Sequence, residues 1–164
     1  MKRGFCSIVL AGLLAMLPGG PQAAGGDDAD TRATPPKDPA LAALVEAEAR
    51  KDWAAAAQLM KAAIARAPAV AEYHNRYAYA LRKGASPDMK LVFHHYREAL
   101  RLEPKHRGAH EYIGEAYLMV GDLPGAKRHL AELDRLCFFG CDEYDELKKA
   151  IAAREKAAQG KQGK

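Results

Sequence analysis

A six-residue phrase that occurs twice sets the period of this chain. Residues 63–68 read Ala-Ile-Ala-Arg-Ala-Pro and residues 99–104 read Ala-Leu-Arg-Leu-Glu-Pro, so the closing prolines lie 36 residues apart. A repeat of about this length with two helical stretches predicts helix pairs that stack, because one pair cannot bury its apolar face alone. Other positions match at offsets of 34 or 36 residues, among them Leu44, Ala78 and Gly114; Met60, Tyr96 and Leu130; and Ala56, Val92 and Ala126.

Capping signals divide each repeat into two helices. Asp38-Pro39 and Ser86-Pro87 are typical of a first helical turn, where a short polar side chain accepts a backbone N–H and proline needs no partner. Gly84 and Gly121 stand where a first helix should end in a left-handed residue. We therefore predict helices over residues 39–50, 53–67, 70–83, 87–102, 106–120, 123–137 and 142–158.

This two-helix unit resembles the tetratricopeptide repeat (TPR). The third unit, from Gly108 to Leu123, carries the small glycine at Gly114 and the Gly121-Asp122 turn of that family. Three positions depart from the pattern: Leu44 replaces a small residue, Leu133 replaces an alanine, and Phe138 stands where proline is usual. The resemblance covers about residues 38–138 and implies an all-α, right-handed superhelix of three helix-turn-helix repeats.

The stretch after the third unit predicts a helix that caps the stack. Tyr144, Leu147 and Ile151 follow one another at steps of three and four residues, which is an apolar helical stripe. Charged residues fill the remaining faces between residues 142 and 158. Such a helix would cover the last apolar surface of the repeats and present its charges to water.

The chain before residue 38 is predicted to lie outside the folded domain. Lys2 and Arg3 precede an apolar run from Phe5 to Leu17, which is too short to span a bilayer comfortably but typical of a signal peptide. A retained membrane anchor is the alternative. We predict a signal peptide over 1–24, a disordered linker over 25–37, the repeat domain over 38–158 and a flexible tail over 159–164. The mature protein would have no membrane span and would be periplasmic or secreted.

Two cysteines form the sharpest local feature. Removal of the signal peptide would discard Cys6 and leave Cys137 and Cys141, which flank Gly140 in a segment that can turn back on itself. An oxidising compartment favours a structural disulfide between them. Metal binding or redox chemistry is the alternative, although two thiols fall short of a closed zinc site. If a metal binds, soft ligands favour copper, with Met119 or a histidine as a further ligand.

The histidines give no clear metal motif. His94 and His95 are adjacent, so their side chains diverge on a helix, and His106 should sit in the turn before the helix of His110. His74 and His110 are equivalent within the repeat, and so are His95 and His129. We interpret all of these as structural or surface residues and predict neither a metal site nor a cofactor.

The resemblance implies a groove lined by the first helix of each unit, which in this family holds a peptide or another protein. From unit one the register projects Leu41, Val45 and Glu48 into it. Asn75, Arg82 and Lys83 could bind a carboxylate, although the match to the carboxylate clamp of the family is loose. The alternative is a polar solvent-facing surface. The predicted groove residues of units two and three are Glu72, Asn75, Tyr79, Arg82, Lys83, Glu111, Glu115 and Met119.

These features predict a scaffold or adaptor that binds a protein or peptide of the cell envelope. No nucleophile–base pair, phosphate loop or acid pair stands out, so an enzyme is not expected. The formal charge is +4, of which Lys2 and Arg3 carry two, and so weak a charge does not favour nucleic acid. A thiol- or copper-handling protein and a self-associating homodimer are the competing interpretations.

Overall fold

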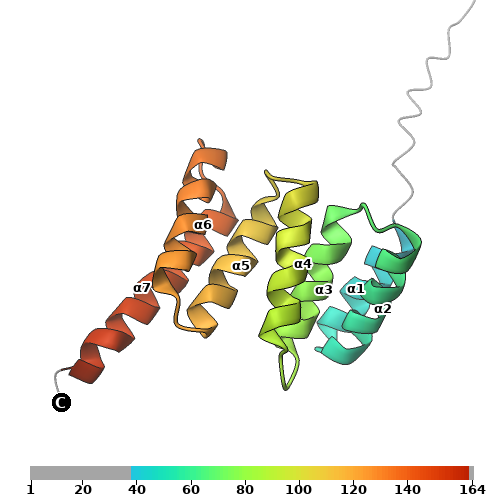
Figure 1. The fold of residues 1–164 in the computed structure, drawn as a ribbon, viewed down its shortest axis with the longest axis horizontal. Coiled ribbons are helices and arrows are strands. Elements are labelled where there is room, and N and C mark those ends of the chain that lie inside the picture. The colour runs from blue at the N-terminus through green and yellow to red at the C-terminus, as the bar shows by residue number, and fades with distance from the viewer. Residues whose placement is uncertain (1–37, 163–164) are drawn as a thin grey trace, which may run out of the picture. The chain divides into compact units, whose positions relative to one another are not determined.

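The computed structural model describes residues 38–162, with side chains described as far as Gln159. These residues form seven helices that succeed one another in chain order (Figure 1). The predicted starts and ends agree to within two residues, except that α7 continues past residue 158 to Gln162. The helices are α1 Pro39–Ala49, α2 Trp53–Arg66, α3 Ala71–Lys83, α4 Met89–Leu102, α5 Arg107–Met119, α6 Leu123–Leu136 and α7 Asp142–Gln162.

Aspartate caps explain most of the helix starts. The side chain of Asp38 accepts the N–H of Ala40, and Asp52 and Asp122 cap α2 and α6 in the same way. One predicted cap is wrong. Residues Ser86 and Pro87 precede α4, and Asp88 is its N-cap, because its carboxylate reaches the N–H groups of Lys90 and Leu91.

The turns within the pairs are of two kinds. Gly121 is left-handed, with φ of 82°, and its equivalent between α1 and α2 is Lys51, with φ of 56°. The other predicted left-handed position is wrong, because Gly84 has φ of −65° and ψ of 167°. Its connection to α4 is longer, so an extended residue replaces the tight turn.

The core repeats with the sequence. The matched positions Ala56, Val92 and Ala126 are all completely buried, as are Met60 and Tyr96. Small residues at one position and larger ones at the next let neighbouring helices interdigitate without voids. Leu130, the third residue of the Met60 set, is only half-buried, so the matched positions form much of the interface between helices but not all of it.

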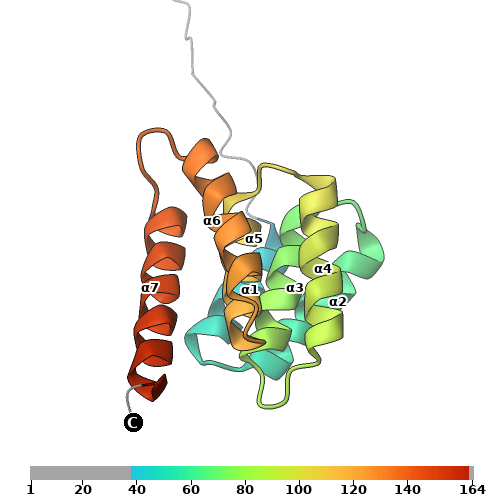
Figure 2. The same cartoon turned by 60° about the vertical axis from the view of Figure 1, so that its left-hand side comes forward.

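Helix α7 covers the last repeat. Figure 2 shows it lying alongside α6, and it contacts both α5 and α6. Leu147 and Ile151 are buried against this surface, and complete burial of such a side chain contributes about 1.5–3 kcal/mol. Gly114 makes the fit possible, because it lies directly beneath Leu147. The predicted capping role of this helix is confirmed.

The predicted signal peptide and linker lie outside the described residues. Among the helices of residues 38–162, none has both the length and the apolar character needed to cross a membrane.

Candidate functional site

The first helices of the three pairs carry the predicted groove residues, and we call the exposed side of α1, α3 and α5 the first-helix face. Glu72 is the centre of its polar contacts. Its carboxylate accepts hydrogen bonds from Asn75 at 3.1 Å, from Arg76 at 2.6 Å and from the Nε2 of His106 at 2.8 Å. Burial raises its pKa, but these three donors outweigh burial and lower the pKa to about 2. The carboxylate is therefore held ionised between α3 and the start of α5.

Arg82 forms a second polar centre and is almost fully buried. Its guanidinium donates to the carboxylate of Glu115 at 2.5 Å and to the hydroxyl of Tyr96 at 3.3 Å. The sulfur of Met119 lies 4.0 Å from it. Because Arg82 lies on α3, Tyr96 on α4 and Glu115 on α5, this residue joins the second unit to the third.

Aromatic rings occupy the middle of the face. The ring of Tyr79 lies 5.7 Å from Trp53 and 4.7 Å from Tyr112, measured between centroids. The ammonium of Lys83 lies 5.8 Å from the Trp53 ring and 5.9 Å from the Tyr79 ring, within the range of a cation–π contact. The sequence had not indicated Trp53 or Tyr112 as part of this face.

Glu111 is the carboxylate of the face with the least favourable environment. Burial raises its pKa to about 7, and the nearby carboxylates of Glu115, Glu143 and Glu146 act in the same direction. Within residues 38–159, no basic side chain lies within ion-pair distance of it. Met119, further along α5, is half exposed.

The structure therefore brings the predicted residues together on one side of the stack. It changes the role that can be assigned to two of them, Asn75 and Arg82. Asn75 is 2% exposed and bonded to Glu72, and Arg82 already holds Glu115. Neither is free to bind an external carboxylate without the loss of an internal contact. Of the three residues proposed for that purpose, Lys83 alone is exposed.

Histidines form the contact that sequence reasoning missed. His74 and His95 meet with their Nδ1 atoms 2.9 Å apart, and His110 and His129 do so at 3.0 Å. The sequence showed that His74 is equivalent to His110 and His95 to His129. It did not show that each residue of the first pair of positions contacts one of the second. His106 behaves as predicted, because it is the N-cap of α5 and its Nδ1 accepts the N–H of Ala109.

Cys137 and Cys141 lie between α6 and α7 with their sulfur atoms bonded and their Cα atoms 5.5 Å apart. Gly140, with φ of 86°, makes the turn between them. Phe138 and Phe139 do not shield the bond, since they are 86% and 97% exposed. The short bridged loop leaves both rings in solvent, in contact with one another at 5.0 Å between centroids.

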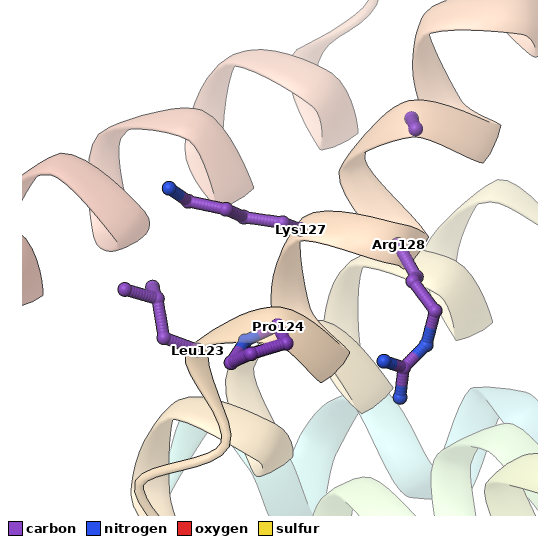
Figure 3. A pocket seen from close by; sticks show the side chains of 5 residues that line it. Leu123, Pro124, Lys127 and Arg128 are labelled. Carbon is purple, nitrogen blue, oxygen red and sulfur yellow. The ribbon is translucent and has the colours of Figure 1, made fainter.

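Concave surfaces occur both on the first-helix face and away from it. On α1, a hollow of about 440 Å³ is lined by Asp38, Leu41, Ala42, Val45 and Glu46. A shallow hollow of about 480 Å³ on α6 is lined by Leu123, Pro124, Lys127, Arg128 and Ala131. Figure 3 shows the side chains of Lys127 and Arg128 leaving α6 in different directions. Lys127 is engaged by Glu155 of α7 at 2.6 Å. The hollow on α6 is open and has no convergent polar groups, so it does not have the features of a ligand site.

The fold is that of a TPR-like helical repeat, and comparison with solved structures supports this class. The structure of PcrH in complex with the chaperone binding region of PopD matches with a TM-score of 0.61 and 15% identity, covering 75% of this chain and 91% of that chain. The type III secretion translocator chaperone SycD of Yersinia enterocolitica matches with a TM-score of 0.61 and 15% identity, covering 76% and 92%. No protein-family model and no curated protein matches the sequence. At this identity the likeness concerns the fold, and the predicted all-α TPR-like architecture is confirmed.

Proposed function

We propose that this protein is a scaffold that binds a segment of another protein on its first-helix face. The observation that carries the proposal is the TPR-like stack, in which three consecutive first helices present one continuous side. Both structures named above are chaperones, and that of PcrH contains the chaperone binding region of PopD. By analogy, an extended or helical segment of a partner would lie across α1, α3 and α5.

The exposed and half-buried side chains of the face indicate how it would contact a partner. Tyr79 and Met119 offer an aromatic ring and a flexible apolar side chain, both suited to adaptable contacts. Lys83 supplies an exposed cation. Burial raises the pKa of Glu111 to about 7, and a cation of the partner would favour its ionised form. Arg82 is paired with Glu115, and Glu72 with Arg76 and His106. These contacts within the protein would hold the helices in place.

We further propose that the protein works after export, in the periplasm or outside the cell. The proposal rests on Lys2-Arg3, the apolar run from Phe5 to Leu17 and the small residues that follow. The partner would then be a protein of the cell envelope.

Capture of a partner by matched variants tests the proposed binding surface. The exported protein is used as bait on envelope extract, and the captured protein is identified and its affinity measured. Lys83→Glu and Met119→Glu should each weaken binding at least tenfold. Lys61→Glu makes the same charge change on an exposed position of α2 and should leave affinity unchanged. Equal binding by all variants would place the partner on another surface.

The thiol interpretation is the second candidate. One atom each of Cys137, Cys141 and Glu143 lie within 4.8 Å of one another, which is the geometry of a three-donor metal site if the bridge is reduced. A soft ion such as copper would suit the two sulfurs. Free thiols in the native protein and binding of one copper ion per chain would favour this function over the scaffold.

A further inference from the structure

The same chain of hydrogen bonds, from a carbonyl oxygen through one histidine to a second, occurs in two units. His74 Nε2 lies 2.9 Å from the carbonyl oxygen of Pro68, and His110 Nε2 lies 3.0 Å from that of Pro104. A carbonyl only accepts, so these Nε2 atoms carry the proton, and the Nδ1 atoms of neutral His74 and His110 are acceptors. Their partners must therefore donate from Nδ1. We call His74–His95 and His110–His129 the two dyads.

Each dyad joins the two helices of one unit. His74 lies on α3 and His95 on α4, while His110 lies on α5 and His129 on α6. The repeat offsets place Ala40 and Leu59 at the same two positions of the first unit. That pair is apolar and cannot bind a proton, so α1 and α2 are held together without a dyad.

The groups around the dyads oppose an added charge on balance. Burial, followed by His74 and His94, lowers the pKa of His95 to about 4, against a smaller opposite effect of Glu98. Burial, followed by His110 and Arg128, lowers the pKa of His129 to about 4, with Arg97 adding to this effect and Glu132 opposing it. Glu98 and Glu132 are each paired with an arginine of the next turn. The ring of Tyr77 also packs against His95, and the ring of Tyr117 against His129.

We propose that the two dyads are an acid-responsive device that loosens the second and third helix pairs while leaving the first pair intact. A proton would bind Nε2 of His95 or His129, which leaves the Nδ1 contact in place but introduces a charge into a half-buried site. The proposal does not depend on what the protein binds.

The first unit supplies the replacement that tests the device. His74→Ala with His95→Leu, and His110→Ala with His129→Leu, copy its apolar pair into units two and three. The pKa values of His95 and His129 are lowered in the folded protein, so the unfolded chain binds protons more readily below the ordinary pKa of 6.5. Each of the two histidines should therefore raise the equilibrium constant for unfolding by up to about tenfold per pH unit below that value. Urea titrations between pH 7 and pH 5 should show this loss, and replacing both dyads should remove most of it. An unchanged pH dependence in that variant would overturn the proposal.

Two measurements on the unmodified protein keep the proposal testable if a replacement fails to fold. Nitrogen-15 NMR should show a proton on Nε2 of His74 and His110 and on Nδ1 of His95 and His129 at neutral pH. On acidification, amide exchange corrected for its intrinsic rate should increase in α3 to α6 before it increases in α1 and α2. Titration of His95 and His129 near 6.5, or uniform exchange along the chain, would contradict the device.

Discussion

Gly114 and Leu147 are in contact across α5 and α7, so closely that a Cβ atom at Gly114 would lie 2.6 Å from a methyl carbon of Leu147. Real side chains do not approach to this distance. Gly114→Leu should therefore displace α7 and lower the free energy of unfolding by about 1–3 kcal/mol. Denaturant titration measures the change.

A second substitution makes this test specific. Leu147→Ala alone should also destabilise the protein, because it leaves a cavity. Combined with Gly114→Ala, however, it should cost less than the sum of the two single changes, since the new methyl group enters the vacated space. Strictly additive effects would show that the two positions do not interact.

The pair of Arg82 and Glu115 should be a strong contributor to stability on the first-helix face. The Arg82 side chain is 7% exposed, and Glu115→Gln would leave its charge without a counter-ion. A loss on the order of 3 kcal/mol follows from removing one partner of a buried ion pair. Glu98→Gln, at the exposed pair with Arg101, is the control and should leave stability nearly unchanged. Equal effects of the two changes would contradict the burial of Arg82.

Glu72 and His106 predict a second pH dependence, in which His106 acts with opposite sign to the dyads. The hydrogen bond to Glu72 raises the pKa of His106, so its contribution is complete below 6.5 and fades as the pH rises through the higher folded value. The contribution of Glu72 is complete above 4.5 and is lost as the pH falls towards 2. The pair should therefore stabilise the fold most between pH 4.5 and 6.5.

His106→Asn isolates this contribution. Asparagine is a good N-cap and should keep the start of α5 intact, but it cannot titrate. The stability difference between the two proteins should be largest near pH 5.5 and smaller at pH 8.5. A difference that is constant with pH would mean that the cap alone accounts for the role of His106.

The cysteine pair should be oxidised in the native protein. Reduction should then increase the intact mass by about 2 Da, the mass of two hydrogens. Replacing both Cys137 and Cys141 by serine should lower stability by about 2 kcal/mol at most, because the closed loop is short. It should leave partner binding nearly unaffected. Free thiols together with lost function and unchanged stability would favour the metal or redox alternative.

Export predicts a processed N-terminus. N-terminal sequencing of the protein from its native host should begin between about residues 20 and 28, as expected for signal-peptide cleavage. Intact Met1 on a protein recovered from the cytoplasm would contradict export. It would also remove the main reason to expect a disulfide.

The helices could be predicted because their limits are determined locally. Asp52 and Asp122 cap helices through contacts three residues away, and sequence spacing contains that information. Ser86 failed as a cap because Asp88 competes for the same role two residues later. Such a choice depends on how the longer α3–α4 connection packs.

The contacts of the site could not be predicted in the same way. Whether His74 meets His95 depends on the rotation of two helices about their axes, which repeat spacing does not specify. Arg82 was assigned to the binding face from its register, but its long side chain reaches back to Tyr96 and Glu115. Phe138 and Phe139 are apolar, yet the five-residue bridged loop leaves both exposed, which composition alone does not indicate.

Leu147 also limits how this architecture can vary. It fills the position above Gly114 that a further unit would need in order to add to the array. Duplication of a unit could therefore lengthen the protein only at a point before α7, with the cap carried along unchanged. The same arrangement defines a boundary for engineering: an additional helix pair inserted after Leu136 would need a glycine or alanine facing Leu147, whereas one fused beyond Gln162 would find no apolar surface of α5 left to extend.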